Sequence, residues 1–239
     1  LKLENATIAY EDTLILDHIN FNLPEHKLSI IVGPNGAGKT TLLKVLSGNR
    51  KLCTGTFLSS FTNSILIPQN PQYPEGLNLF DYISTVYFQH GFKWTLCQSE
   101  KDEINAILKE LHLEQRKHHY LNELSSGELQ LANVALCLAS KSNFILLDEP
   151  TANLDPMNQK LILDKLKYLT TRNITIVLIM HDLNVACQYG DLFIIILKNK
   201  KLLQGSKKQI FTEENLKNSY GIDFKVFDHD ENIYLHPVF

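Results

Sequence analysis

Short apolar runs alternate along the chain with longer stretches in which apolar residues recur every three or four positions. The clearest case covers residues 28–48. Its first part, Leu28–Val32, is almost continuously apolar, which is typical of a strand covered on both faces. After Gly38 the apolar residues fall at helical spacing, and Gly48 is suited to end that helix. The pattern predicts a strand, a glycine-rich turn and a helix.

The same alternation returns in the second half of the chain. Strand-like apolar runs stand at Phe144–Asp148, Ile174–Met180 and Leu192–Leu197, and helical patterns lie between them, the first from Pro156. Strands that alternate with helices are typical of parallel βαβ units. We therefore expect a parallel sheet that also includes residues 28–32.

Three other regions differ from this pattern. Residues 3–23 mix β-branched and polar residues, as antiparallel strands do. Residues 71–123 predict a mostly helical region with a helix from about Ser99, and residues 205–239 predict a short helix and a small hairpin. The buried face of the helix near Ser99 is formed by Ile104, Ile107, Leu108 and Leu111.

Composition narrows the class of protein. The chain has 239 residues and a formal net charge of −3, from 26 acidic and 23 basic residues. A general nucleic-acid binder usually carries a basic excess, so we expect no nucleic-acid partner. Hydrophobic residues make up 44% and charged residues 21%, as in globular proteins. The length allows one large domain with a small inserted or appended unit.

Apolar runs and cysteines bear on the compartment. The longest apolar runs are of strand length, far below the roughly 18 residues of a membrane-spanning helix. The first ten residues lack the features of a secretory signal peptide. The four cysteines, 40 to 50 residues apart, show no close pair typical of zinc or thioredoxin sites. We expect reduced thiols in a cytosolic compartment.

The sequence GPNGAGKT fits the phosphate-binding pattern G-x-x-x-x-G-K-[ST] between a predicted strand and a predicted helix. Its glycines allow backbone N–H groups to point at a phosphate chain, and the helix adds its positive N-terminal end. Lys39 would reach the β- and γ-phosphates, Thr40 would offer a hydroxyl to Mg²⁺, and Thr41 would contact another phosphate oxygen. The expected ATP-binding residues here are Gly33, Pro34, Asn35, Gly36, Ala37, Gly38, Lys39, Thr40 and Thr41.

Two carboxylates follow the apolar run Phe144–Leu147, at the end of the strand where ligands bind in open α/β sheets. Asp148 would hold Mg²⁺, and Glu149 would polarise the attacking water as a general base. Taken alone, the pattern fits a strand that ends in a polar turn equally well. Beside a phosphate-binding loop, the catalytic interpretation is favoured.

The segment LSSGE, residues 124–128, allows two interpretations. Ser125 and Glu128 form the S-x-x-E pattern of a capping box, which starts a helix for structural reasons. A capped helix N-terminus with a glycine also gives an anion a close, positive approach. The two interpretations are compatible, and this segment by itself favours the structural one.

Together these motifs resemble the ATP-binding subunit of ATP-binding cassette (ABC) transporters. The phosphate-binding loop matches fully, and LSSGE is similar to the family's signature motif LSGGQ. Gln69 matches the glutamine loop, which senses Mg²⁺ and contacts the membrane partner. Asp155 matches the loop that crosses to the other subunit. His181 matches the switch histidine, and Tyr10 matches an aromatic residue that stacks on adenine.

The resemblance covers nearly the whole chain and implies an α/β fold: a P-loop NTPase core with a mostly parallel sheet, an N-terminal antiparallel β part and an inserted helical subdomain. One domain would span residues 1–239, with the subdomain at about 71–143 inserted into a RecA-like core of residues 1–70 and 144–239. The implied catalytic residues are Lys39, Gln69, Glu149 and His181. The implied Mg²⁺ ligands are Thr40, Gln69 and Asp148. The further implied ATP contacts are Tyr10 and, from a second copy, Ser125, Ser126, Gly127, Glu128 and Asp155.

Taken singly, several of these residues have structural interpretations. A residue such as Gln69 is more often an ordinary loop glutamine, and one such as Tyr10 is more often a half-buried strand residue. His181 fits a hydrogen-bonded core histidine, and Asp155 before a proline is a good helix N-cap. These alternatives stay open at the level of sequence.

The chain departs from the family's pattern in several places. Ser126 replaces the second glycine of the signature, which puts a side chain where the backbone approaches phosphate. Glu128 replaces a glutamine, and Leu131 stands where the family often has arginine. The 30 residues from Lys39 to Gln69 are few for the family, which predicts trimmed strands in the antiparallel part.

The segments His181–Asn184 and Phe211–Leu216 are similar to importers of ferric siderophores, haem or vitamin B12, and zinc and manganese importers resemble these in places. The resemblance implies a subunit that uses ATP and Mg²⁺ and forms a homodimer when ATP is bound. It also implies integral-membrane permease partners, an extracytoplasmic substrate-binding protein as an indirect partner, and a peripheral position on the cytoplasmic face of the inner membrane.

Two other classes share the phosphate-binding loop. A P-loop kinase or GTPase would need an acceptor pocket or a guanine motif such as N-K-x-D, which is not found. A soluble cassette protein that acts on ribosomes or DNA usually has two cassettes or a long coiled coil. This chain has one cassette and no sustained heptads.

Overall fold

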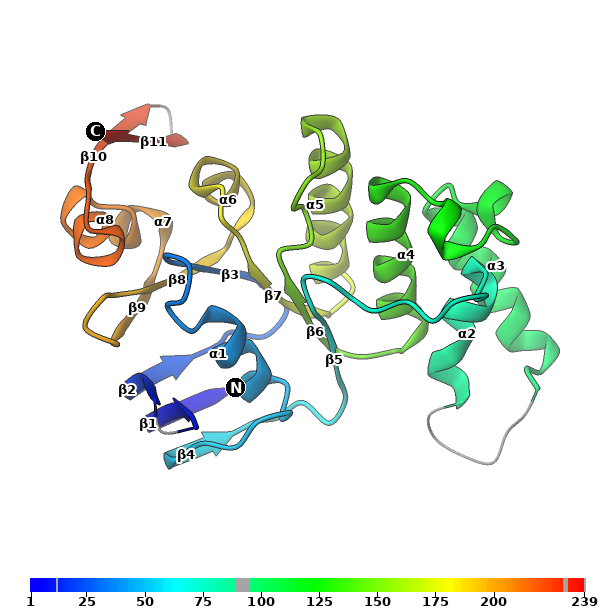
Figure 1. Ribbon diagram of the computed structural model, residues 1–239, viewed down its shortest axis with the longest axis horizontal. Coiled ribbons are helices and arrows are strands. Elements are labelled where there is room, and N and C mark those ends of the chain that lie inside the picture. The colour runs from blue at the N-terminus through cyan, green and yellow to red at the C-terminus, as the bar shows by residue number, and fades with distance from the viewer. Residues whose placement is uncertain (12, 89–94, 230–231, 239) are drawn as a thin grey trace.

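The computed structural model of the chain describes residues 1–11, 13–88, 95–229 and 232–238 (Figure 1). Within these residues, six strands form the central sheet in the order β5-β6-β7-β3-β8-β9. All neighbouring strands run parallel except β8 and β9, which are antiparallel. The strands are β3 (Leu28–Val32), β5 (Ser64–Ile67), β6 (Phe144–Asp148), β7 (Thr175–Ile179), β8 (Leu192–Ile196) and β9 (Leu202–Gly205). The predicted, mostly parallel sheet is confirmed.

Both faces of the central sheet are buried, which explains the continuous apolar runs. Along β6, Ile145 and Leu147 belong to one hydrophobic cluster, and Phe144 and Leu146 belong to the other. Side chains of a strand point alternately to its two faces, so a strand between two covering layers must be apolar at every position. Residues of β3 and β7 divide between the same two clusters.

One covering layer is helix α1 (Lys39–Leu46), which lies between the central sheet and a second, antiparallel sheet (Figure 1). The second sheet has the strand order β2-β1-β4. Its strands are β1 (Lys2–Tyr10), β2 (Thr13–Asn22) and β4 (Thr54–Leu58). Leu42 and Leu43 of α1 are fully buried in the same cluster as Ile8 and Leu16 from the antiparallel sheet. Strand β4 has only five residues, against nine and ten in β1 and β2.

Helices α2, α3 and α4 gather at the other end of the molecule, and α5 lies between them and the central sheet (Figure 1). They are α2 (Leu79–Phe88), α3 (Gln98–Glu110), α4 (Ser126–Ala139) and α5 (Pro156–Thr170), with short 3₁₀ turns at Glu114–Arg116 and Leu121–Glu123. The helix predicted from about Ser99 begins at Gln98, and its expected apolar face is buried. The boundaries of an inserted unit at residues 71–143 stay a prediction.

The last part of the chain packs beside the central sheet. It contains α6 (Leu183–Tyr189), α7 (Lys207–Ile210), α8 (Glu213–Tyr220) and a hairpin of β10 (Asp223–His229) and β11 (Asn232–Val238). The Asn184 side chain holds the hairpin by donating to the Leu235 carbonyl and accepting from the Leu235 N–H. For residues 205–239 the sequence predicted one short helix, and the structure has two, α7 and α8, before the hairpin. Among the described residues, no helix is both long and apolar enough to span a bilayer.

Candidate functional site

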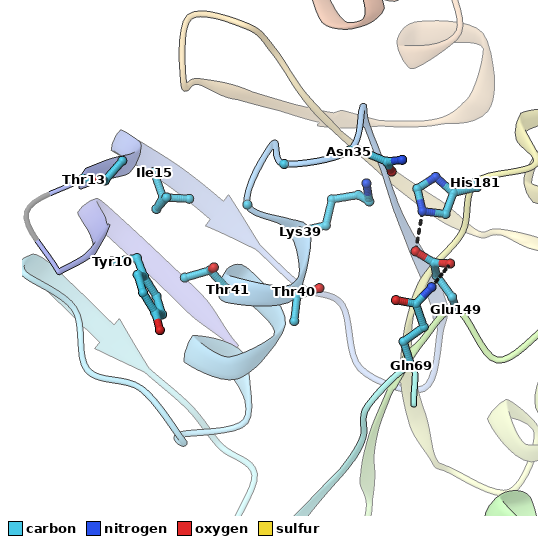
Figure 2. A pocket seen from close by; sticks show the side chains of 12 residues that line it. Tyr10, Thr13, Ile15, Asn35, Lys39, Thr40, Thr41, Gln69, Glu149 and His181 are labelled. Atoms are coloured by element: carbon cyan, nitrogen blue, oxygen red, sulfur yellow. Dashed lines mark hydrogen bonds and ion pairs between the residues drawn. The ribbon is translucent and has the colours of Figure 1, made fainter. Parts of the chain in front are cut away.

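An open pocket of about 700 Å³ lies beside the glycine-rich loop, residues 33–40, and the carboxyl ends of the strands β5, β6 and β7 (Figure 2). Tyr10 stands at one end of the pocket, and Gln69, Glu149 and His181 stand at the other. Its lining residues are Tyr10, Thr13, Ile15, Asn35, Gly36, Gly38, Lys39, Thr40, Thr41, Gln69, Glu149 and His181. The pocket thus brings together most of the residues that the sequence singled out, from five separate parts of the chain.

The glycine-rich loop reaches helix α1 through a backbone that needs glycine. Gly38 has a φ of 98°, and a Cβ atom there would lie 2.1 Å from Cγ2 of Ile15 on β2. Gly38 is also the N-cap of α1 and offers no side chain to cap it. The first N–H groups of α1 therefore lack a side-chain acceptor at the pocket, and with the helix dipole they favour an anion there.

Lys39 folds back over the loop. Its ammonium donates to the carbonyl oxygens of Gly33 and Pro34, each at 2.9 Å. Burial lowers the pKa of Lys39, while Glu149 and Asp148 act in the opposite direction. An ammonium has three N–H donors, so one remains for a further acceptor such as a phosphate oxygen.

Thr40 and Asp148 meet at the end of β6. The hydroxyl of Thr40 donates to Oδ2 of Asp148 at 2.7 Å. Burial raises the pKa of Asp148 despite this hydrogen bond, and a cation at the same place would offset that effect. A hydroxyl and one carboxylate suit Mg²⁺, which takes its other ligands from phosphates and water. In the part of the chain that the structure describes, no three His, Cys, Asp or Glu side chains form a metal cluster.

Glu149 is held between two neighbours at the far end of the pocket. Nε2 of Gln69 donates to its Oε2 at 2.6 Å, and Nε2 of His181 is hydrogen-bonded to its Oε1 (Figure 2). These three side chains follow β5, β6 and β7, which are adjacent in the sheet. The backbone of Glu149 has a φ of 53°, an uncommon conformation for a residue other than glycine. Such strain is typical of residues at functional sites.

Tyr10 is the last residue of β1, and the residue as a whole is 51% exposed. The sequence patterns did not single out Arg50, which lies against the Tyr10 ring. The guanidinium carbon of Arg50 lies 4.6 Å from the centroid of the Tyr10 ring. Thr13 and Ile15, which also line the pocket, were missed as well. Their position depends on how β1 pairs with β2, and that pairing contains register shifts that no sequence pattern predicts.

The signature residues 124–128 and Asp155 do not line this pocket. They stand at the starts of helices α4 and α5. Oγ of Ser125 accepts from the N–H of Glu128 at 3.3 Å, and Oε2 of Glu128 accepts from the N–H of Ser125 at 2.8 Å, which forms the capping box. Asp155 caps α5 by accepting from the N–H groups of Met157 and Asn158. The structural interpretations of both motifs are confirmed.

These two helix starts also touch each other. Nδ2 of Asn158 donates to Oδ2 of Asp155 at 2.6 Å. The same Asn158 amide fills the space beside Gly127, where an added Cβ would lie 3.0 Å from its Cγ atom. Ser126 lines a smaller cavity with Gln69 and Asn153. The signature segment and the Asp155 loop therefore form one surface. Its residues do not line the main pocket, although Gln69 lines both that pocket and the smaller cavity.

A mostly parallel sheet, a glycine-rich loop and a pocket at the carboxyl ends of the strands define an α/β protein suited to bind phosphates. The model of one family, described as ABC transporter, matches residues 16–152, more than half of the chain. The chain belongs to the ABC transporter family. The predicted family, fold class and ATPase activity are thereby confirmed.

Relatives and solved structures agree with this membership. The petrobactin import ATP-binding protein FpuD of Bacillus anthracis is 32% identical over 95% of this chain and 88% of its own length. The iron(3+)-hydroxamate import ATP-binding protein FhuC of Bacillus subtilis is 30% identical over 95% of this chain and 89% of its own. A metal-chelate type ABC transporter in an inward-facing conformation superposes with a TM-score of 0.89 at 25% identity, covering 100% of this chain and 97% of that one.

Proposed function

We propose that this chain hydrolyses Mg²⁺-bound ATP in the pocket between Tyr10 and Glu149 and thereby powers an importer of a metal chelate. The observation that carries the proposal is the convergence of Gln69, Glu149 and His181 opposite Lys39. A nucleotide laid along the pocket would have its base at Tyr10 and its terminal phosphate near these three side chains, as the layout in Figure 2 supports.

Each residue would have a distinct task. Tyr10 would stack on adenine, and residues 33–41 would surround the phosphates with N–H donors while Lys39 supplies positive charge. Glu149 would accept a proton from the attacking water, and His181 would contact the γ-phosphate. Mg²⁺, held by Thr40 and Asp148 with Gln69 nearby, would neutralise charge on the phosphate oxygens.

The second surface completes the proposal. None of Ser125, Ser126, Gly127 and Glu128 lines the main pocket of its own copy, so they would serve the pocket of a second copy, together with Asp155. Donors aimed at developing charge act most strongly in an interface without water. The active form would then be a homodimer that holds ATP between the pocket of one copy and the signature surface of the other.

The cargo is inferred from the relatives. Two of them are named for the import of petrobactin and of iron(3+)-hydroxamate, and the structural neighbour is of the metal-chelate type. We propose a ferric siderophore, haem or cobalamin as cargo, permease subunits as direct partners and an extracytoplasmic binding protein as an indirect one. The subunit would lie on the cytoplasmic face of the inner membrane. A zinc or manganese importer, or a soluble ABC ATPase, is the alternative.

The test is reconstitution with the permease and binding protein encoded beside this chain. Vesicles would receive Mg²⁺ and ATP, and uptake of a ferric siderophore, haem, cobalamin, Zn²⁺ and Mn²⁺ would be compared. We expect ATP-dependent uptake of one of the chelates, lost in Lys39→Ala because nucleotide binding is weakened. Uptake of the bare metal ions alone would favour the alternative cargo. Hydrolysis without any membrane partner that co-purifies would favour a soluble ATPase.

A further inference from the structure

Arg50 lies against one face of Tyr10 and has no place in the motifs described above. Its guanidinium carbon is 4.6 Å from the ring centroid, within the distance at which a cation is attracted to an aromatic face. Nη2 of Arg50 also donates to the carbonyl oxygen of Ala9 at 2.7 Å, one residue before the tyrosine. Two contacts thus fix the guanidinium beside the end of β1.

The backbone of Arg50 is fixed as well. Helix α1 ends at Leu46, and Gly48 follows with a φ of 79°, in the left-handed conformation that turns the chain away from the helix. The N–H of Arg50 then donates to the carbonyl oxygen of Lys44 at 3.0 Å. This hydrogen bond attaches Arg50 to the C-terminal end of α1, and the glycine-rich loop lies at the other end of the same helix.

The two faces of the Tyr10 ring differ in their surroundings. Tyr10 lines the pocket, and Arg50 does not. The residue Tyr10 is 51% exposed even though the guanidinium lies against one face of its ring, so its exposed surface lies away from Arg50. A flat ring held from behind and open in front is suited to stack on a planar base.

We propose that Arg50 is a positioning residue that holds Tyr10 as the platform for the base of the bound nucleotide. This inference rests on the proposed ATP site. The guanidinium restricts the rotation of the tyrosine side chain, so less freedom is lost when the base binds. Its charge also draws electron density toward the covered face, which favours stacking of an electron-rich purine on the open face. The base end and the phosphate end of the pocket are thereby both attached to helix α1.

The test is a double-mutant cycle on the affinity of the full chain for Mg²⁺-bound ATP. Calorimetry would compare the natural chain, Arg50→Ala, Tyr10→Ala and the double variant. We expect Arg50→Ala to weaken binding about three- to tenfold. In the Tyr10→Ala background the same change should have no effect, because its action passes through the ring. Lys51→Ala, which removes the neighbouring exposed cation, should leave affinity within about twofold and serves as the control.

A second readout separates the platform from a general effect on the pocket. Tripolyphosphate has the phosphates of ATP without its base. Its dissociation constant, obtained by displacing a fluorescent ATP analogue and corrected for the affinity of that analogue, should be the same for Arg50→Ala as for the natural chain. Arg50→Met keeps the apolar stem over the ring and replaces the alanine variant if that one does not fold. An equal penalty with and without Tyr10, equal weakening of ATP and tripolyphosphate, or no penalty would overturn the inference. A natural chain that binds no ATP would instead overturn the proposed function.

Discussion

At the scale of single residues, the carboxylate of Glu149 is the most constrained group of the pocket. Gln69 and His181 approach its two oxygens from the adjacent strand ends, and its backbone is in an uncommon conformation. A carboxylate held by two neighbours has a fixed direction, which a general base requires. Binding of a nucleotide would exchange some of these contacts for contacts to phosphate and water.

The substitution Glu149→Gln tests this role. Glutamine has the same shape and can keep a hydrogen bond to each neighbour, but it cannot accept a proton from water. We expect steady-state ATP hydrolysis by the reconstituted complex to fall at least about 100-fold, while the affinity of the subunit for ATP stays within about threefold. Phosphate release assays and calorimetry would measure the two quantities. Hydrolysis at the natural rate would exclude Glu149 as the base.

Some of the pocket residues were predictable from local sequence patterns. Lys39 belongs to the glycine-rich loop and Glu149 follows an apolar run, whereas Gln69 and Tyr10 were expected only from the family resemblance. The structure brings all four into one cavity. Their contacts were not predictable. Arg50 reaches Tyr10, and Ile15 excludes a side chain from Gly38, only because segments that are separate in the sequence meet in space.

At the scale of elements, the start of α4 forms the capping box that the S-x-x-E pattern predicted. The Ser125 and Glu128 side chains satisfy each other's backbone N–H groups. Glu128 also pairs with Arg116 at 2.7 Å. Burial opposes ionisation of Glu128, but the hydrogen bonds from the Ser125 N–H and from Arg116 outweigh it and lower its pKa. The charge also suits the positive end of the helix.

This pKa shift predicts a pH-dependent contribution to stability. A carboxyl group whose pKa is lower in the folded chain stabilises the fold at any pH above its ordinary pKa, which is 4.5 for Glu128. This contribution is lost as the pH falls through the folded pKa. Glu128→Gln keeps the cap but removes the charge. We expect it to lower the free energy of unfolding at pH 7 by about 0.5 kcal/mol or less, since solvent screens the group.

Urea unfolding at pH 7 and at a pH below the folded pKa of Glu128, which itself lies below 4.5, would measure this difference. The gap between Glu128→Gln and the natural chain should close at the lower pH. The matched control is Glu114→Gln, which removes an exposed carboxylate from the nearby 3₁₀ turn and should leave stability almost unchanged at both values. A gap that persists at low pH would show that the glutamine disturbs the cap itself.

At the scale of the whole molecule, the sequence predicted the layers well, since the inner strands β3, β6 and β7 are almost entirely apolar and are buried on both faces. It could not show that the signature segment and the Asp155 loop meet through Asn158, because that contact joins helices whose packing angle no local pattern fixes. Packing therefore makes one surface of two motifs that lie about 30 residues apart. Residues 124–128 and Asp155 do not line the main pocket of the same copy, which is why we propose that this surface acts on a second copy.

Gly127→Val tests the use of that surface. The valine side chain would meet the amide of Asn158, 3.0 Å from the Cβ added to the buried Gly127, and would push apart the two helix starts that form the signature surface. The pocket of the same copy is not lined by Gly127, so its affinity for ATP should stay within about twofold. Hydrolysis by the complex should fall at least about tenfold, because donors from the second copy would no longer reach the phosphates.

Light scattering would show the reason for this loss. With ATP and Mg²⁺, the Glu149→Gln chain should form a dimer, because nucleotide is retained between two copies, and the same chain carrying Gly127→Val should stay monomeric. Gly127→Ala, with a smaller clash, should give an intermediate dimer fraction, which would argue against a simple loss of folding. A dimer that forms equally in all three proteins would place the contact elsewhere on the molecule. Loss of ATP affinity in Gly127→Val would mean that the signature surface and the pocket are not separate within one copy.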